Sequence, residues 1–515
     1  MKAESDQKSM RLRRGEGPPI RLLTAVPICD GHDSAINTLN LEFIRHGIEV
    51  IYLGYHRSAR DIVRAAIQED ARAIGISSYN GGHLEFFAEV LARLKQQGAS
   101  SIGVFGGGGG TITSDDAAMM KMRGVDEIFF AGTPLPEMVE WVKRTYRSPA
   151  RSRARGASPD RQLAQLLSSV ESGRRLNFLA LSPSKPPPLA ERSRERGWRG
   201  RGPHHQSQIT NRKSPIQVLA LSPLHPPLGE LSGRGGRLGG GRGRNTITIG
   251  ITGPGGAGKT TLIDELVLRF LKAHPDGRLA ILSHDPSVRG HGALLGDRAS
   301  MIYSQDDRVF MRSLATRGRA GGLSAATETC LRVLKQSAFD LVLVETVGIG
   351  QEALPFGRSL LRPLPLQTSP SRGAVEGEGV EGERAKYLVD KTVLVMSPDY
   401  GSRLQLQKIV MLDRADLVVI NKSDLPGART ALVEVEQRLS MNRPTPDPSE
   451  EGSKHSSAPC QFPSWEGLGV GSWSQCTASK SWGLSSNRRG KRLFSTTAKR
   501  HRDAGVDALF RELMS

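Results

Sequence analysis

The clearest chemical signal in the sequence is a glycine-rich run that ends in a lysine and two threonines. It follows an apolar run and opens the helical pattern TLIDELVLRFL. Glycines allow backbone N–H groups to close around a polyphosphate, a lysine reaches the β and γ phosphates, and a hydroxyl can ligate Mg²⁺. The run therefore predicts a nucleoside triphosphate site with Lys259 as a catalytic cation and Thr260 as a magnesium ligand. Its expected nucleotide-binding residues are Gly253, Gly256, Ala257, Gly258, Lys259, Thr260 and Thr261.

A second polar run predicts which base this site accepts. Asn421, Lys422, Ser423 and Asp424 follow the apolar run ADLVVI. A carboxylate at Asp424 can accept the two N–H donors that guanine presents and adenine lacks, while the Lys422 stem packs on the ring. A site that pairs buried polar groups rejects a ligand without those groups by a large factor. The run indicates GTP as the substrate, with Asn421, Lys422 and Asp424 in the binding site.

Three acidic residues stand where Mg²⁺ would find the hard oxygen ligands that it prefers. Asp285 and Glu345 each end an apolar run, and Asp297 belongs to the loop-like, glycine-rich segment 286–298. We expect all three to ligate magnesium and Glu345 to be catalytic as well. We expect the segment 286–298 to be a switch that the γ-phosphate orders. The residue that positions the attacking water stays open among Arg289, Arg298 and Gln351.

Near the N-terminus, polar residues and glycines follow three further apolar runs. Asp30 and His32 lie in the run CDGHD, Ser77 lies in SSYNGGH, and the third run continues into the glycines 106–110. A neutral histidine can ligate a metal through one ring nitrogen while a carboxylate fixes its tautomer through the other. Hydroxyls and glycines beside it would form a slot in which a planar or nucleotide-like ligand approaches the backbone. The pattern favours a ligand site at the carboxyl edge of a sheet.

The elements that must position these residues alternate between short β-branched runs and helical patterns. This alternation predicts parallel sheets that are covered by helices on both faces. We therefore expect two doubly wound α/β domains, a flavodoxin-like or Rossmann-like domain over residues 20–146 and a P-loop NTPase domain over residues 246–515. The expected strands are 20–27, 49–54, 73–78, 101–107 and 127–130 in the first domain, and 246–253, 278–285, 339–348, 392–399, 415–424 and 492–499 in the second.

Most of the positive charge lies outside these two domains. The formal net charge of the 515 residues is +19, and residues 147–245 hold 19 basic against 5 acidic residues. This segment is rich in Arg, Pro, Gly and Ser, repeats the phrase LALSP, and has too few apolar residues to offset its ordering entropy. We expect it to be a disordered linker. A disordered tail at 1–19 and low-complexity insertions at 357–386 and 441–492 are expected as well.

Composition excludes several classes of protein. Four scattered cysteines argue against a disulfide framework and against a cysteine-rich zinc site. No apolar run approaches the length of a membrane span, and the charged N-terminus does not resemble a signal peptide. These features predict a soluble cytoplasmic protein that does not bind a membrane.

The first group of motifs, DGHD, SSYNGGH and FGGGGG in this order, resembles the cobalamin-binding domain of adenosylcobalamin-dependent acyl-CoA mutases. The resemblance implies adenosylcobalamin as the cofactor. His32 would be the lower axial cobalt ligand and Asp30 its hydrogen-bond partner. Ser77 would contact the buried nucleotide tail, and Gly106 and Gly107 would line the channel of that tail.

The second region resembles the GTPase chaperones of those mutases through GPGGAGKTT, HDPS, GALLGDR, FMRSLATRG, ETVGIGQ and NKSD. A cobalamin domain followed by such a GTPase is the order found in the N-terminal half of the fused isobutyryl-CoA mutase family. In that family the loop after the last strand approaches the guanine, which makes Thr497 and Ala498 candidates for base contacts.

The match to the family has departures. The cobalamin pattern has Gly where this chain has Ala35 and Leu where it has Tyr79, and either change would narrow the tail pocket. The family also continues into an acyl-CoA mutase barrel, for which about 250 residues are needed, whereas this sequence ends at Ser515. We expect such a barrel to be supplied in trans by a separate subunit.

The leading interpretation is a protein that holds adenosylcobalamin in its first domain and hydrolyses GTP in its second, so that hydrolysis gates loading or protection of the cofactor. One alternative is a stand-alone GTPase metallochaperone that no longer binds the cofactor. Another is a basic protein that binds nucleic acid through residues 147–245, which the location of the charge disfavours. A non-functional product of a broken gene and assembly as a homodimer are also left open.

Overall fold

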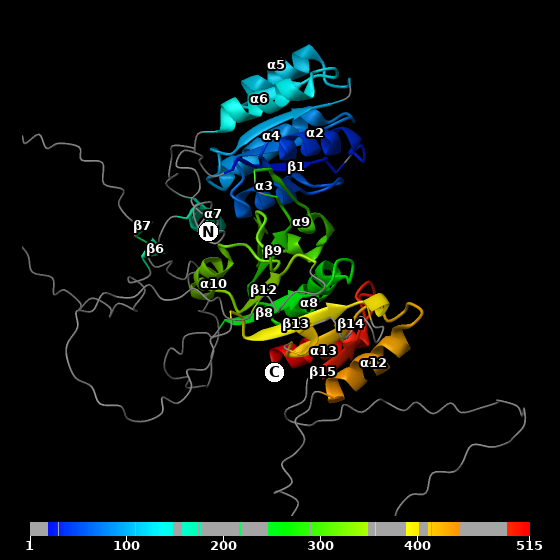
Figure 1. Ribbon diagram of the computed structural model, residues 1–515. Helices are drawn as coiled ribbons and strands as arrows, with labels where there is room; N and C mark the ends of the chain where they lie inside the picture. The colour runs from blue at the N-terminus through cyan, green and yellow to red at the C-terminus, as the bar shows by residue number, and fades with distance from the viewer. Residues whose placement is uncertain are drawn as a thin grey trace, which may run out of the picture.

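The expected fold class is confirmed by a computed structural model of the chain, in which two parallel α/β sheets lie one above the other (Figure 1). The structure describes residues 19–28, 30–108, 110–147, 157–173, 176–177, 216–217, 246–288, 290–348, 356, 388–400, 410–413, 415–441 and 492–515. Among the described helices none is long and apolar enough to cross a membrane.

The first sheet has the strand order β10-β2-β1-β3-β4-β5, and every pair in it is parallel. Its own strands are β1 (Arg21–Ala25), β2 (Glu49–Tyr52), β3 (Ala73–Ser77), β4 (Gly103–Gly107) and β5 (Glu127–Phe129). The helices between them are α2 (Ser34–Arg45), α3 (Ala59–Gln68), α4 (His83–Gln96), α5 (Ser114–Met122) and α6 (Leu135–Tyr146). All strands run the same way, so their carboxyl ends, with the loops expected to bind ligand, meet at one edge.

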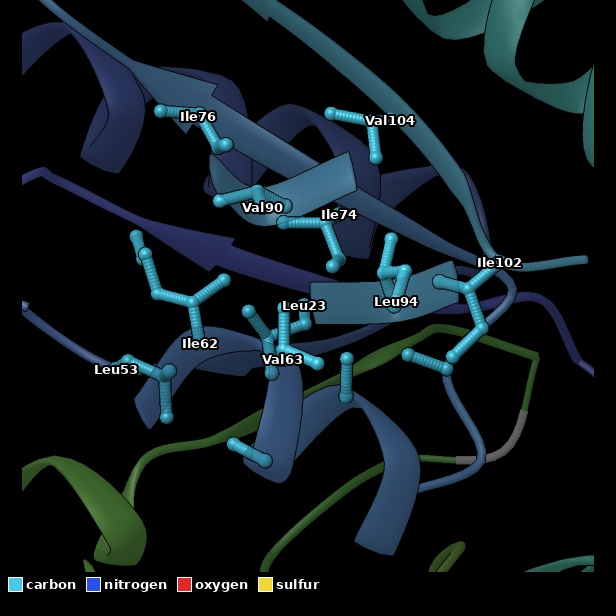
Figure 2. Close-up of a cluster of buried hydrophobic side chains, with 14 of the residues drawn as sticks. Leu23, Leu53, Ile62, Val63, Ile74, Ile76, Val90, Leu94, Ile102 and Val104 are labelled. Atoms are coloured by element: carbon cyan, nitrogen blue, oxygen red, sulfur yellow. The ribbon is translucent and has the colours of Figure 1, made fainter. Parts of the chain in front are cut away.

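Alternation along the central strands provides a core on each face of this sheet. On one face, Leu23 of β1 and Ile74 and Ile76 of β3 pack against α3 and α4. The helices contribute Ile62, Val63, Val90 and Leu94 to this cluster (Figure 2). On the other face Leu22 packs with Phe43 of α2 and Val139 of α6. Because side chains of a strand point alternately to opposite faces, the near-continuous apolar runs of the sequence are explained by burial on both sides.

The second sheet has the order β11-β9-β12-β8-β13-β14-β15 and is also parallel throughout. Its strands are β8 (Ile247–Thr252), β9 (Leu279–Asp285), β11 (Val309–Ala315), β12 (Leu341–Glu345), β13 (Lys391–Met396), β14 (Leu417–Ile420) and β15 (Arg492–Ser495). The α-helices of this part are α8 (Lys259–Ala273), α9 (Asp297–Ser300), α10 (Thr327–Gln336), α12 (Ala428–Met441) and α13 (Ala504–Met514). Short 3-10 turns are η2 (Tyr303–Gln305), η3 (Pro398–Tyr400) and η4 (Val410–Asp413).

Part of the segment 147–245 is folded, which corrects the expectation of a wholly disordered linker. Helix α7 (Pro159–Glu171) carries Leu163, Leu167 and Val170 at helical spacing, and these side chains are buried against β11 and α10. The bulk composition of the segment concealed this local periodicity. Farther along, the two-residue strands β6 (Leu176–Asn177) and β7 (Ile216–Gln217) pair with each other. The rest of the linker, the 1–18 tail and nearly all of both insertions lie outside the described residues.

The segment expected to be a switch loop contains a strand that belongs to the first sheet. Residues Ala293–Leu295 form β10, which pairs in parallel with β2 of the other domain, with Ala293 opposite Glu49. Just before it, the Gly292 N–H donates to the Ile44 carbonyl at 2.8 Å. A Cβ at Gly292 would lie 1.8 Å from the Ile48 carbonyl oxygen, so only glycine permits this approach. The two domains therefore share a sheet and are not independent units.

A buried network of arginines and glutamates lies where the first domain contacts α7, α9 and β11. Glu69, at the end of α3 and fully buried, pairs with Arg21 at 2.8 Å and with Arg298 at 3.3 Å. Glu171 of α7 pairs with Arg312 at 2.6 Å and with Arg21 at 3.2 Å. Burial alone would raise the pKa of Glu171, but the guanidinium groups of Arg312 and Arg21 outweigh it and hold that pKa below its ordinary value. The network joins the first domain, α7 and β11.

Substitution of Glu69 by Gln tests this network. The change leaves the buried Arg298 guanidinium without its carboxylate partner and removes one of the three carboxylates that pair with Arg21. Breaking a buried pair typically costs about 3–5 kcal/mol. We expect a loss of about 3 kcal/mol in the free energy of unfolding, measured by urea denaturation. As a control, Arg60→Met removes an exposed pair with Asp307 and should cost less than about 1 kcal/mol. Equal effects of the two changes would contradict the role given to the network.

Candidate functional site

The glycine-rich run forms a loop between β8 and α8, as its spacing predicts. Gly258 is the residue before α8 and has a φ of +84°, a left-handed conformation that a residue with a Cβ rarely adopts. Gly253 lies against β13, where a Cβ would come within 1.9 Å of the Val395 carbonyl oxygen. Gly256 is exposed on the loop, and the Ala257 side chain is buried beneath it. Backbone N–H groups thus gather at the N-terminus of a fifteen-residue helix, the usual setting for a bound phosphate.

Lys259 and the two threonines open α8. The buried Lys259 Nζ donates to the carbonyls of Gly253 and Pro254 at 3.1 and 3.2 Å. Burial lowers the pKa of this ammonium, while the nearby Glu345 and Asp297 carboxylates act in the opposite direction. Thr260 Oγ1 donates to Glu345 Oε1 at 2.7 Å, whereas Thr261 is exposed in the same turn. The lysine therefore stands beside both the loop and the acidic residues.

The structure brings together the three acids that the sequence singled out. Asp285 ends β9, Glu345 ends β12, and Asp297 begins α9. The Asp297 carboxylate accepts a hydrogen bond from Ser283 Oγ. Burial and repulsion from Asp297 raise the pKa of Asp285 and that of Glu345 each to about 8. Burial raises the pKa of Asp297 too. Carboxyls in this state are poised to exchange a proton for a cation.

Orphaned oxygens show that this acidic cluster fits a metal ion. Asp285 Oδ2 and Glu345 Oε2 are buried and, in the part of the chain that the structure describes, accept no hydrogen bond. No three His, Cys, Asp or Glu side chains in that part are placed to hold a metal by themselves. Mg²⁺ often takes only one or two carboxylates and completes its shell with phosphates and water. The Thr260 hydroxyl and the orphaned carboxylates of Asp285 and Glu345 therefore suit Mg²⁺ that arrives with a nucleotide. Asp297 as a further ligand stays a prediction.

The side-chain amide of Asn421 links the polar run after β14 to the phosphate loop by a hydrogen bond. Asn421 donates to the Ala257 carbonyl at 2.9 Å, and its oxygen accepts from the Ala498 N–H at 3.0 Å. Thr497 Oγ1 lies 2.7 Å from Ser423 Oγ. Lys422 has a φ of +58°, a left-handed conformation at the turn between these contacts. Thr497 and Ala498 thus contact the turn that carries Asn421 and Ser423. Their place beside a guanine base stays a prediction.

Asp424, the expected guanine receptor, lies at the mouth of this turn. Its carboxylate pairs with Lys499 Nζ at 2.5 Å, and a hydrogen bond from this lysine lowers the pKa of Asp424. An ionised carboxylate is the form that accepts the two guanine N–H groups. Lys499 was missed by the sequence reasoning, although its place directly after Thr497 and Ala498 was a usable signal.

The first sheet carries a second cluster at its carboxyl edge. Asp30 is fully buried, and its Oδ1 lies 2.8 Å from Nδ1 of His32. Its other oxygen accepts N–H groups of Tyr79 and Asn80. Burial would raise the pKa of Asp30, but these backbone donors and His32 lower it, so the carboxylate stays ionised. It therefore holds a proton on Nδ1 of His32, which leaves Nε2 as the lone-pair nitrogen of a side chain that is 63% exposed.

The residues expected around a cofactor tail are adjacent but tightly packed. Ser77 and Gly107 face each other across β3 and β4. A Cβ at Gly106 would lie 2.4 Å from the Phe87 ring, and one at Gly107 would lie 2.6 Å from the Phe129 carbonyl oxygen. These glycines are thus required by the chain's own packing. The Tyr79 ring lies 4.8 Å from the His32 ring, centroid to centroid. Asp30 and His32 are arranged as an axial cobalt ligand and its hydrogen-bond partner would be. The places of Ser77, Gly106 and Gly107 around a cofactor tail stay predictions.

Of the three candidates for positioning water, one is excluded by its contacts. Arg298 is buried in the domain interface, where it donates to Gln68 and Glu69 of α3 and to the Met311 carbonyl. It cannot also reach a water at the phosphate loop, because these partners hold its guanidinium in the interface. Arg289 and Gln351 lie outside the described residues.

A pH series on Glu345→Gln tests the buried acid. Because its folded-state pKa of about 8 lies above its ordinary value of 4.5, the folded protein holds an extra proton between these values, and its stability falls as pH rises from about 4.5 to about 8. Without metal, we expect Glu345→Gln to melt roughly 5 °C higher than the parent at pH 9 and at the same temperature at pH 4. A melting difference that does not depend on pH would contradict this view.

Comparison with known proteins identifies both domains. Residues 20–139 match the family described as the B12 binding domain, and residues 238–355 match the methylmalonyl-CoA mutase-associated GTPase MeaB. The fused isobutyryl-CoA mutase of Cupriavidus metallidurans is 33% identical over 443 residues, which is 84% of this chain and 33% of that protein. The fused mutase of Geobacillus kaustophilus is 33% identical over 81% of this chain and 33% of its own length.

A separate GTPase also resembles the second domain. A putative GTPase of Pyrococcus abyssi is 37% identical over 200 residues, 38% of this chain and 52% of that protein. The chain spans about a third of the length of the fused mutases that it matches. It contains a B12-binding domain followed by a GTPase domain of the MeaB family, and it is a homologue of the fused isobutyryl-CoA mutases.

Proposed function

We propose that this chain binds adenosylcobalamin through His32 and hydrolyses GTP in its second domain, so that the nucleotide gates loading or protection of the cofactor. The observation that carries the proposal is the pair formed by the buried, ionised Asp30 and the exposed His32, whose Nε2 is free to ligate cobalt. The partner of the cofactor-loaded chain is an acyl-CoA mutase barrel of the isobutyryl-CoA type, supplied in trans. Bound adenosylcobalamin supplies the radical that starts the rearrangement on such a barrel.

Exposed apolar side chains around His32 support this partner. Ile28, Tyr55, Tyr79 and Phe130 follow β1, β2, β3 and β5, and each is between 44% and 59% exposed. Parallel strands place all four at the same edge of the sheet. A corrin ring and the mouth of a second domain would cover this apolar rim, which on a monomer would otherwise stay in water.

GTP hydrolysis follows from the charge arrangement at the phosphate loop. Lys259 and a Mg²⁺ held by Thr260 and the acids neutralise charge on the transferring phosphoryl group. A cation held by these residues would offset the repulsion between the buried carboxylates. The same cluster begins α9, which packs against the first domain, so the nucleotide state acts where the domains meet.

Titration with cobalamin tests the first half of the proposal. We expect the visible spectrum of bound cobalamin to show a nitrogen ligand from the protein, and His32→Ala to remove that signature. His46→Ala, which changes the exposed histidine directly after α2, should retain it. Asp30→Asn should weaken binding about tenfold, in line with the effect of partners behind metal-ligating histidines. An unchanged spectrum of the His32→Ala complex would disprove axial ligation.

A stand-alone GTPase is the second candidate function, and one observation favours it. The Phe87 ring occupies the space beside Gly106 where a tail channel is expected. That function predicts normal GTP turnover with no cobalamin binding by the parent protein in the same titration.

A change of base specificity tests the second half of the proposal, which is GTP hydrolysis in the second domain. Asp424→Asn replaces one acceptor by an amide donor, which suits the C2 carbonyl of xanthine instead of the exocyclic amine of guanine. We expect kcat/KM for GTP to fall roughly 100-fold or more, and that for xanthosine triphosphate to rise. Steady-state hydrolysis of both nucleotides measures the exchange. The control is Asp276→Asn, which changes an exposed acid before β9, at the opposite edge of the sheet. Retained GTP preference would refute the assignment of Asp424.

A further inference from the structure

The loop that carries His32 is fastened to the loop that follows β2. The Val26 N–H donates to the Gly54 carbonyl at 3.0 Å, and the Arg57 N–H donates back to the Val26 carbonyl at 3.1 Å. Next to this bridge, Nδ1 of His56 donates to the Ile28 carbonyl at 3.0 Å. Movement of the second loop must therefore displace the first.

The loop after β2 is in turn fastened to the GTPase. The Arg57 guanidinium reaches across the domain boundary and donates to the Ala299 carbonyl of α9 at 2.7 Å. Beneath it, the position of a Cβ at Gly54 would lie 3.9 Å from the Ala299 Cβ, so α9 is packed directly on this loop. Burial lowers the pKa of Arg57, which marks its guanidinium as partly desolvated.

Helix α9 is itself one end of the metal site. Asp297 is its first residue, and Ala299 follows after a single intervening residue. The Asp297 carboxylate accepts a hydrogen bond from Ser283 Oγ on β9, two residues before the orphaned Asp285 at the end of that strand, so it lies beside the metal site. A Mg²⁺ ion held at these carboxylates would attract Asp297, the residue at which the short helix α9 begins.

We propose that Arg57 is a positioning residue that couples the nucleotide site to the axial-ligand loop through the Ala299 carbonyl. The inference rests on the proposed function of His32 and Asp297. It names the connection from the metal-binding carboxylate through α9 and Arg57 to the loop of residues 26–32. By linkage, a nucleotide that changes cobalamin affinity by some factor must have its own affinity changed by cobalamin by the same factor.

Two equilibrium titrations of the full chain test this coupling. The dissociation constant of adenosylcobalamin is measured with and without Mg²⁺ and a non-hydrolysable imido analogue of GTP, and that of the analogue is measured with and without cobalamin. We expect the same shift of about tenfold in both, within the range typical of coupled sites. Arg57→Met should reduce it below about twofold while each ligand alone still binds. Arg57→Lys, which retains a donor for the Ala299 carbonyl, should retain much of it.

Arg60→Met is the matched control, because Arg60 also crosses to the second domain, where it pairs with Asp307, yet touches neither loop. It should leave the tenfold shift unchanged. Cobalamin and nucleotide binding without mutual shifts in the parent protein would overturn the inference and leave the proposed function standing. So would full coupling in Arg57→Met.

Hydrogen exchange provides a readout that does not need the cofactor. We expect the analogue with Mg²⁺ to change exchange at the Val26 and Arg57 amides, which form the bridge between the loops, at least threefold in the parent and in Arg60→Met but not in Arg57→Met. If cobalamin fails to bind at all, the proposed function falls, and this experiment still decides the coupling. Unchanged exchange at both amides in the parent would overturn it.

Discussion

Backbone pairing between β10 and β2 is the constraint on which the rest of the structure depends. Main-chain hydrogen bonds fix the register, so that Ala293 lies opposite Glu49 and Leu295 opposite Ile51. A shift by one residue would turn the side chains of β10 to the wrong faces. Once the register is set, Arg298 meets Glu69, and Arg317 Nη2 reaches Glu49 at 2.7 Å. The buried charges can be satisfied only in this one arrangement of the domains.

The two candidate sites use opposite electrostatic strategies. At His32 the buried carboxylate is satisfied by backbone donors and stays charged, so the imidazole is held in one tautomer. At the phosphate loop the buried carboxylates lack enough donors and favour their protonated form. The first arrangement keeps a ligand ready for a metal, whereas the second creates a demand for a cation that arrives with the nucleotide. At the phosphate loop, the positive charge that would balance the buried carboxylates is thus supplied only when the nucleotide binds with its cation.

Local motifs could be interpreted from the sequence because their geometry is set by a few consecutive residues. The glycines before Lys259 and the turn after Asn421 required only strand, loop and helix in order. Strand β11 was not predicted, because Arg312 interrupts its apolar pattern and the partner that satisfies it, Glu171, lies 141 residues earlier. Strand β10 was missed for the same kind of reason, since its pairing partner β2 belongs to another domain and only three residues pair.

The tail side of the cobalamin cluster shows the other limit of sequence interpretation. Consecutive glycines indicate that something approaches the backbone closely, but not whether it is a ligand or the chain itself. Here the Phe87 ring and the Phe129 carbonyl take that place. The sequence assigned these glycines to the channel of a cofactor tail, which stays a prediction, and the structure adds the protein's own neighbours.

The strand that β10 adds also protects the first sheet. Without it, β2 would be an edge strand with unpaired N–H and C=O groups beside the buried Val50 and Ile51, the kind of exposed edge along which polypeptides aggregate. The first domain alone, separated from the second, would therefore be prone to self-association. Fusion of the two domains in one chain keeps that edge covered from the moment that both have folded.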